Sequence, residues 1–492
     1  MSWISLKSAY LKITFSPFSL GFFLFIFIHC LSEGFIQAFI YSQDTVASNL
    51  ITSILHQAQV PRNILGILDA PYGNTSLSVC NSLDPSLKGD ERLCALVFRK
   101  GQPNLPLPTK FDLAPYKDGV DVSLNGKPIH LSPMCTLVLT YPHQMLLNAQ
   151  REGVVLILSQ FWLFALSFFG IVYDSIPHLV AAICCRTLTT AWSMYILWRN
   201  SDNQYRFTML LASDDSPCKP LLIDDMFPRY FIWRQILQNP DVALNIIGFA
   251  LAIYLSSKLI KARFPYMVRR LSIASAHRQQ LFASITTSWR FSFHSRYVPA
   301  GFFAFSFYKR FVWVSALLLI SVVCLWLEQI VNHDNAISSL TLHRNLYIAL
   351  SVFTLVYLVP WIALGWYAVR REWKHAMLAF LLLATIVLAS WILMLKSWSF
   401  VWTFMNWPLF TVQFTGASVS LLSTIIFGVI SYLHFDKGLA HYLYVDDQLA
   451  QAGFEPDLFE KDVEKGHDWR EIGLDHLPPR TLQFSTVSNN SM

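Results

Sequence analysis

Long apolar stretches recur along this chain and are separated by short polar connections. A helix crosses the ~30 Å hydrocarbon layer of a bilayer with about 20 mostly apolar residues. Beyond residue 150, several stretches meet this length or nearly so, and each predicts a membrane-spanning helix. They are Val154–Tyr173, His178–Trp198, Val242–Ser257, Phe311–Ile330, Leu346–Val369, Ala376–Leu395 and Pro408–Leu433. The third is short, so we expect it to borrow residues from its flanks.

An earlier apolar stretch, Phe18–Tyr41, allows two interpretations. As a secretory signal peptide, residues 18–28 would form its apolar part, with small residues following for cleavage. As a retained signal anchor, the helix would carry His29, Glu33 and Gln37 on one face, because these residues recur every four positions. The length of the stretch favours the signal anchor.

The basic residues predict an orientation. Lys and Arg accumulate in the cytoplasmic loops of membrane proteins, and the connector 258–310 holds ten of them without any Asp or Glu. If successive helices cross the membrane in alternating directions from this connector, residues 42–153 lie on the extracytoplasmic side. The acidic tail 434–492, with the C terminus, falls in the cytoplasm. Candidate contacts for anionic lipid or for this tail are Arg263, Arg269, Arg270 and Arg278.

Composition agrees with a membrane protein. Hydrophobic residues make up 54% of the chain and charged residues only 14%, whereas soluble domains carry roughly 25% charged residues. The formal net charge of +6 is modest, and no nucleic-acid-binding module is visible. The expected fold is an all-α polytopic membrane bundle of seven or eight helices with a small α+β extracytoplasmic domain. Its expected parts are a signal segment at 1–41, the extracytoplasmic domain at 42–153, a seven-helix bundle at 154–433 and the tail at 434–492.

Within residues 42–153 the pattern predicts short elements. Ile51–Val60 is apolar at helical spacing, whereas Arg92–Phe98, Val120–Leu124 and Cys135–Tyr141 are rich in β-branched residues and predict strands. Asn125-Gly126 is typical of a two-residue hairpin turn.

The cysteines provide a separate test of the orientation. Cys80, Cys94, Cys135 and Cys218 fall in segments assigned to the extracytoplasmic side, and none of the eight cysteines falls in a cytoplasmic loop. An oxidising compartment would allow up to two disulfides among these four, in any of three pairings, or some could be free and buried. Asn74, in an Asn-Thr-Ser triplet, is a glycosylation acceptor on the same side.

Ionisable residues inside a membrane are rare and usually functional. Arg186 lies well inside its predicted helix, and Glu33 is its acidic counterpart. The helical rise puts them ~12 Å and ~22 Å from the inner boundary, so a direct pair needs a tilted helix or an extended Arg186. Arg186 could instead snorkel to the cytoplasmic surface. The candidate ligand or transport residues are Arg186, Glu33, Gln160 and Gln413. Of these, Gln160 and Gln413 are more typical of hydrogen bonds between helices.

Motifs of known enzyme chemistry are missing from the sequence. It contains no Gly-rich phosphate loop, His-Glu-x-x-His zinc motif, Cys-x-x-Cys pair or Gly-x-Ser-x-Gly elbow. We therefore predict no catalytic residue, no metal site and no cofactor, and an enzyme is not favoured.

Several strings resemble a family of fungal multipass membrane proteins without an established activity. They are Asp174-Ser-Ile-Pro-His-Leu179, Leu188-Thr-Thr-Ala-Trp192, Pro360-Trp-Ile-Ala-Leu-Gly-Trp-Tyr-Ala-Val-Arg-Arg-Glu372 and Phe435-Asp-Lys-Gly-Leu439. The resemblance extends over residues 137–443 and implies the helical topology, but no mechanism.

Two functions stand as hypotheses. In the first, the extracytoplasmic domain binds a ligand or protein partner, and the bundle anchors or transmits that event, as in a receptor, sensor or scaffold. In the second, the chain is a transporter or channel for a small solute or lipid. Either protein would reside in the plasma membrane or a membrane of the secretory pathway, with anionic lipid at its cytoplasmic face.

Overall fold

The fold is described from a computed structural model of the chain. The described backbone covers residues 6–14, 16–69, 75–83, 93–102, 105–108, 119–124, 127–173, 175–218, 227–283, 291–332 and 335–435. Within these ranges, the side chains of residues 6–9, 123–124, 127, 227–228 and 262–306 lie outside the description.

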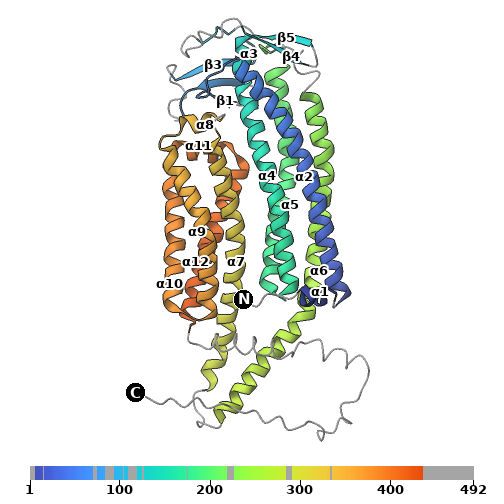
Figure 1. The fold of residues 1–492 in the computed structure, drawn as a ribbon, viewed down its shortest axis with the longest axis vertical. Helices are drawn as coiled ribbons and strands as arrows, with labels where there is room; N and C mark the ends of the chain where they lie inside the picture. The colour runs from blue at the N-terminus through green and yellow to red at the C-terminus, as the bar shows by residue number, and fades with distance from the viewer. Residues whose placement is uncertain are drawn as a thin grey trace.

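Eight of the described helices are long and apolar enough to cross a membrane (Figure 1). They are α2 (Pro17–Gln57), α4 (Thr140–Val172), α5 (Ile176–Leu211), α6 (Phe227–Ala283), α7 (Phe291–Val331), α9 (Arg344–Arg370), α10 (Lys374–Met394) and α12 (Pro408–Leu433). Shorter helices are α1 (Leu6–Thr14), α3 (Pro133–Val138), α8 (Ala336–Leu340) and α11 (Trp398–Asn406). The prediction of a mainly helical chain with seven or eight helices able to span a membrane is confirmed.

The helices pack in two groups. The first group is α2, α4, α5 and α6, in which α2 contacts α4 and α6 while α5 contacts α4 and α6. The second group is α7, α9, α10 and α12, and α7 joins it to α4 and α5. The stretch interpreted as a signal peptide or an anchor thus lies within α2 and packs into the first group, which favours the anchor.

The first group extends further than the second. With 41 residues, α2 is ~60 Å long at 1.5 Å per residue, about twice the hydrocarbon thickness. In Figure 1 the upper ends of α2, α4, α5 and α6 reach the strands, whereas α9, α10 and α12 end below them. We call the end of the bundle that carries the strands the sheet end, and the other the opposite end.

Many apolar side chains point away from the bundle, as expected for lipid contact. Phe353, Val356 and Val359 of α9 are each at least 65% exposed, and Leu378 and Leu382 of α10 are more than half exposed. A soluble protein would rarely present so large an apolar surface to water.

The strands form two small antiparallel sheets. In the first, β1 (Leu65–Asp69), β2 (Ser76–Cys80) and β3 (Cys94–Arg99) lie in the order β1-β2-β3. In the second, β4 (Val120–Leu124) pairs with β5 (Lys127–Leu131), and Leu124 lies opposite Lys127. This register leaves two residues between the strands, as the hairpin prediction required, although Asn125 and Gly126 themselves lie outside the described residues. Strands β1 and β2 were not predicted.

The strand predicted at Cys135–Tyr141 is wrong, because the chain is helical there. Ser132 precedes Pro133, and its hydroxyl accepts a hydrogen bond from the Cys135 N–H at 3.2 Å. An N-cap serine followed by proline is a strong start signal for a helix, and it outweighs the β-branched residues that follow. The segment Ile51–Val60, expected as a separate helix, belongs mostly to α2.

Two disulfides join the sheet end. Cys80 in β2 is bonded to Cys94 in β3, and Cys135 in α3 is bonded to Cys218 beyond α5. The structure therefore confirms the predicted number of disulfides and selects one of the three pairings. Asn74, the candidate glycosylation acceptor, lies outside the described residues.

Several helices continue past the ends that hydropathy predicted. The expected boundaries at 41/42 and 153/154 fall inside α2 and α4, and the expected basic loop at 258–310 is helical over 258–283 and 291–310. These helices continue because polar residues with good helix propensity do not end a helix. The end of an apolar stretch therefore does not by itself mark a helix terminus.

Candidate functional site

Arg186 is buried in the first group and does not extend to the membrane surface. Only 3% of its surface is exposed. Its guanidinium donates to His29 Nδ1 at 3.0 Å and lies 5.7 Å from the centre of the Phe25 ring. His29 Nε2 lies 3.1 Å from the Leu244 carbonyl oxygen. A neutral His29 that accepts at Nδ1 and donates at Nε2 satisfies both contacts.

A stripe of polar side chains continues from Arg186 toward the sheet end, between α2 and α6. The spacing along each helix, three, four or seven residues, keeps these side chains on one face, and none is more than 7% exposed. We call this stripe the polar track. It consists of Glu33, Gln37 and Asp44 on α2 and Arg234, Gln238, Asp241 and Asn245 on α6.

At the inner part of the polar track, two carboxyl groups meet. The Asn245 side-chain amide donates to Glu33 Oε2 at 3.0 Å, and Gln37 Nε2 donates to Asp241 Oδ1 at 2.6 Å. The same Asn245 nitrogen also donates to the Asp241 backbone carbonyl at 3.0 Å, so Asn245 brings Glu33 and Asp241 together. Glu33 therefore pairs directly with α6, while Arg186 lies one turn away, beside His29.

At the part of the polar track nearer the sheet end, Asp44 forms an ion pair with Arg234. The Tyr230 hydroxyl donates to Asp44 Oδ1 at 2.7 Å. These contacts hold α2 and α6 together about 16 Å from Glu33, because eleven residues of helix separate Asp44 from it.

Gln160 and Gln413, the two other candidates, lie outside the polar track. Gln160 is buried in α4, and Gln413 is half-buried in α12. Their side-chain oxygens have no hydrogen-bond partner among the described residues. The expected interhelical hydrogen bonds through these oxygens are not seen.

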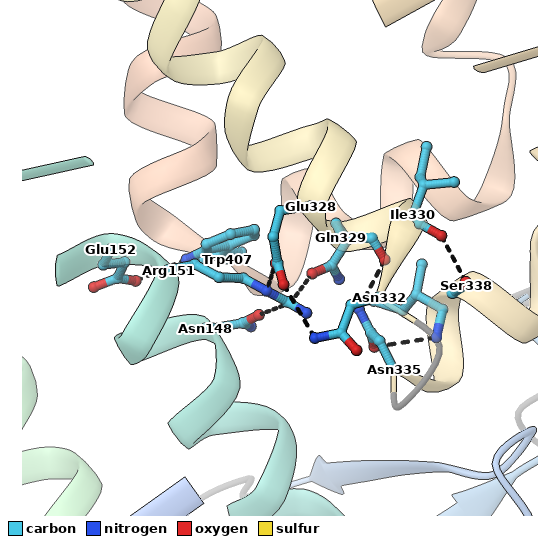
Figure 2. A network of polar contacts seen from close by, with 11 residues as sticks. Asn148, Arg151, Glu152, Glu328, Gln329, Ile330, Asn332, Asn335, Ser338 and Trp407 are labelled. Carbon is cyan, nitrogen blue, oxygen red and sulfur yellow. Dashed lines mark hydrogen bonds and ion pairs between the residues drawn. The ribbon is translucent and has the colours of Figure 1, made fainter. Parts of the chain in front are cut away.

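A second set of polar contacts joins the two helix groups (Figure 2). Glu152 of α4 accepts both guanidinium N–H groups of Arg199 from α5, and Trp407 Nε1 donates to Glu152 Oε1 at 2.7 Å. The neighbouring Arg151 forms an ion pair with Glu328 of α7 and donates to Gln329 Oε1. We call these six residues the joint network.

A cavity of about 290 Å³ lies beside the joint network, at the sheet end. Strand β1, helices α4, α5 and α6, and the segment from α11 to Pro408 all contribute to its wall. Its polar lining includes amide side chains and three arginines, and its apolar lining is rich in aromatic rings. Among the lining residues are Tyr141, Asn148, Glu152, Tyr195, Trp198, Arg199, Asn200, Asp202, Asn203, Arg206, Tyr230, Arg234, Trp402, Asn406 and Trp407.

Each arginine in this wall has a carboxylate partner. Arg199 pairs with Glu152, Arg234 with Asp44, and Arg206 lies 2.8 Å from an Asp202 carboxylate oxygen. The cavity therefore carries no strong excess charge. Flat aromatic rings beside amide and paired charged groups suit a neutral or zwitterionic polar ligand that also has an apolar face.

A second cavity, of about 330 Å³, lies where α2 ends and α4 begins. Its lining includes Thr52, His56, His143 and Asn335. Thr52 Oγ1 and His143 Nε2 are 3.0 Å apart, so part of its polar lining is already engaged in an internal hydrogen bond.

Sequence reasoning missed most of these groups. The apolar stretches end before they reach these charged residues, so the sequence places them in extracytoplasmic segments. They are Asp44, Glu152, Arg199, Arg234 and Asp241. Their helical spacing relative to Glu33 and Asn245 is the signal that could have identified the polar track. Partners such as Glu152 and Trp407, which are 255 residues apart in sequence, leave no local signal.

The remaining predictions concern metals and lipid. Among the described residues, no group of three or more His, Cys, Asp or Glu could hold a metal ion. The side chains of Arg263, Arg269, Arg270 and Arg278 lie outside the described part of the chain, so their contact with anionic lipid stays a prediction.

No protein-family model, curated protein or solved structure matches this chain. The resemblance to fungal multipass membrane proteins therefore also stays a prediction.

Proposed function

We propose that this chain is a multipass membrane protein that binds a small ligand in the cavity at its sheet end, which faces the extracytoplasmic side. The observation that carries the proposal is the cavity itself, because its wall combines the sheet, the first helix group and the start of the second. A ligand there would contact both groups at once. This is the arrangement expected of a receptor or sensor.

The joint network supplies a means of transmission. Glu152, Arg199 and Trp407 all line the cavity, and their mutual contacts connect α4, α5 and the residue directly before α12. A ligand that hydrogen bonds to any of them competes with these contacts and so changes how the two groups pack. If the ligand binds one arrangement of the two helix groups more tightly than the other, binding would favour that arrangement by the difference in binding free energy.

Two features support the proposed orientation. Both disulfides lie at the sheet end, and disulfides persist in oxidising compartments. Nine of the ten basic residues between 258 and 310 lie in the described parts of α6 and α7 that extend to the opposite end, where the positive-inside tendency favours the cytoplasm. The C terminus would then be cytoplasmic, in the plasma membrane or a secretory-pathway membrane, and anionic lipid would be the partner of the basic segment.

A ligand screen on the purified full chain tests this proposal. A ligand that binds the folded state raises its thermal stability, so we expect stabilising compounds among neutral sugars, amino acids and zwitterionic headgroup analogues. Asn203 lines the cavity, whereas the neighbouring Gln204 is exposed and does not. Asn203→Trp should abolish the stabilisation and Gln204→Trp should preserve it. Equal responses in both variants would contradict binding in this cavity.

The polar track favours a second candidate, a transporter for a small solute. Buried polar residues that continue from the cavity to Arg186 are typical of substrate or ion pathways. In reconstituted vesicles, Arg186→Leu should then reduce the uptake of any compound that the screen identifies. Unchanged uptake would remove Arg186 from this role.

A further inference from the structure

The polar track and the adjacent Arg186 together contain one more carboxyl group than they have cations. Its acidic members are Glu33, Asp44 and Asp241, whereas the buried cations beside them are Arg186 and Arg234. Asp44 and Arg234 form a neutral pair. Among the described residues, this leaves Arg186 as the one cation that balances the negative charges of both Glu33 and Asp241.

The surroundings of Glu33 supply no further cation. On α2 the nearest titratable groups are His29 and Cys30, and the contacts of His29 are those of a neutral ring. On α6 it faces Asp241 and Asn245, and α5 contributes Arg186. On α4, Glu152 lies nearer the sheet end and is paired with Arg199.

The hydrogen bonds around the two carboxyl groups also indicate that one proton is missing. Ionised carboxylates only accept hydrogen bonds, and among the described residues the Glu33 carboxyl group receives one from Asn245 and the Asp241 carboxyl group one from Gln37. Glu33 Oε1, which is fully buried, has no hydrogen-bond partner among the described residues. An unpaired charge in such an interior is costly. One added proton cancels the excess charge and supplies the missing donor.

We propose that Glu33 and Asp241 form a proton-binding site that exchanges one proton with the sheet end along the polar track. Without the proton, Glu33, Asp241 and Arg186 together carry one negative charge. Binding takes one proton from solution, forms one O–H bond on a carboxyl group and makes the site neutral. No electron is transferred.

The polar track provides the route for exchange. Between the carboxyl pair and the cavity lie Gln238 and Asp44, and Gln238 Oε1 and Asp44 Oδ2 also lack hydrogen-bond partners among the described residues. Arg234 and Tyr230, at the end of the track, line the cavity. Toward the opposite end, the next two buried residues after His29 on α2 are Ile26 and Phe22, which offer a proton no acceptor, and the next buried polar residue, Ser19, lies ten positions from His29.

The inference does not depend on the cavity ligand, and infrared spectroscopy tests it without one. The probe is the full chain in lipid nanodiscs, titrated with buffer alone. A protonated carboxyl group has a C=O stretch that a carboxylate lacks. We expect this band in the wild type at neutral pH, where exposed carboxyl groups are ionised, and its loss in both Glu33→Gln and Asp241→Asn.

Controls separate the site from its surroundings. Asp202→Asn, which alters a partly exposed ion pair, should retain the band. Gln238→Leu should retain the band but slow its change after a pH jump. A wild-type spectrum without the band would overturn the inference even if the variants failed to fold, and so would a band that survives in folded Glu33→Gln and Asp241→Asn.

Discussion

At the residue scale, charges remain inside these helices because specific partners neutralise them. Glu152 accepts hydrogen bonds from Arg199 and Trp407, so most of its acceptor capacity is filled. Its position could not be predicted from the sequence, because its partner Arg199 comes from α5 and its partner Trp407 from the junction of α11 and α12. Arg186 and Glu33 were identified because they interrupt apolar stretches, but their depths gave no indication that His29 would separate them.

Removing Arg199 should destabilise the protein strongly. Arg199→Leu leaves the buried Glu152 carboxylate without its cation, and such losses cost about 3–5 kcal/mol in soluble proteins. Thermal unfolding of the purified protein measures the effect. Arg206→Leu is the matched control, because Arg206 forms a partly exposed pair within one helix, and such pairs contribute less than about 1 kcal/mol. Equal losses would show that the Arg199–Glu152 pair of the joint network does not stabilise the bundle.

At the element scale, hydropathy predicted the membrane-crossing part of each helix but not its ends. Helix α12 matches its prediction, Pro408–Leu433, because a proline fits the first turn and the apolar stretch ends at the helix terminus. Helices α4 and α5 instead continue with polar residues whose burial depends on neighbouring helices. The strands β1 and β2 are short, and their pairing depends on distant residues, so local pattern did not reveal them.

Close helix packing in the second group depends on glycines. A Cβ atom at Gly365 of α9 would lie 2.3 Å from the Tyr308 hydroxyl and 2.5 Å from the Phe380 ring, whereas one at Gly21 of α2 would meet nothing within 4 Å. We expect Gly365→Ala to cost about 1–3 kcal/mol through overpacking. Gly21→Ala should be neutral or slightly stabilising in the same thermal unfolding measurement. A neutral Gly365→Ala would contradict the tight contact of α7, α9 and α10.

At the scale of the whole molecule, the two helix groups meet at the joint network, and the first group alone extends to the sheets. This asymmetry places the cavity of about 290 Å³ above the second group and beside the first. The proposal that the cavity receives a ligand from outside the cell or from a lumen depends on one spatial claim, that the sheet end and the opposite end face different compartments.

Labelling with a membrane-impermeant maleimide in sealed vesicles of known orientation tests this claim most directly. Asp121 is exposed in the hairpin at the sheet end, and Lys374 is exposed at the start of α10, at the opposite end. With the wild type as the blank, Asp121→Cys should be labelled from the extracytoplasmic side, and Lys374→Cys only after the vesicles are opened. Labelling of both positions from one side, or of Lys374→Cys alone from the extracytoplasmic side, would contradict the account.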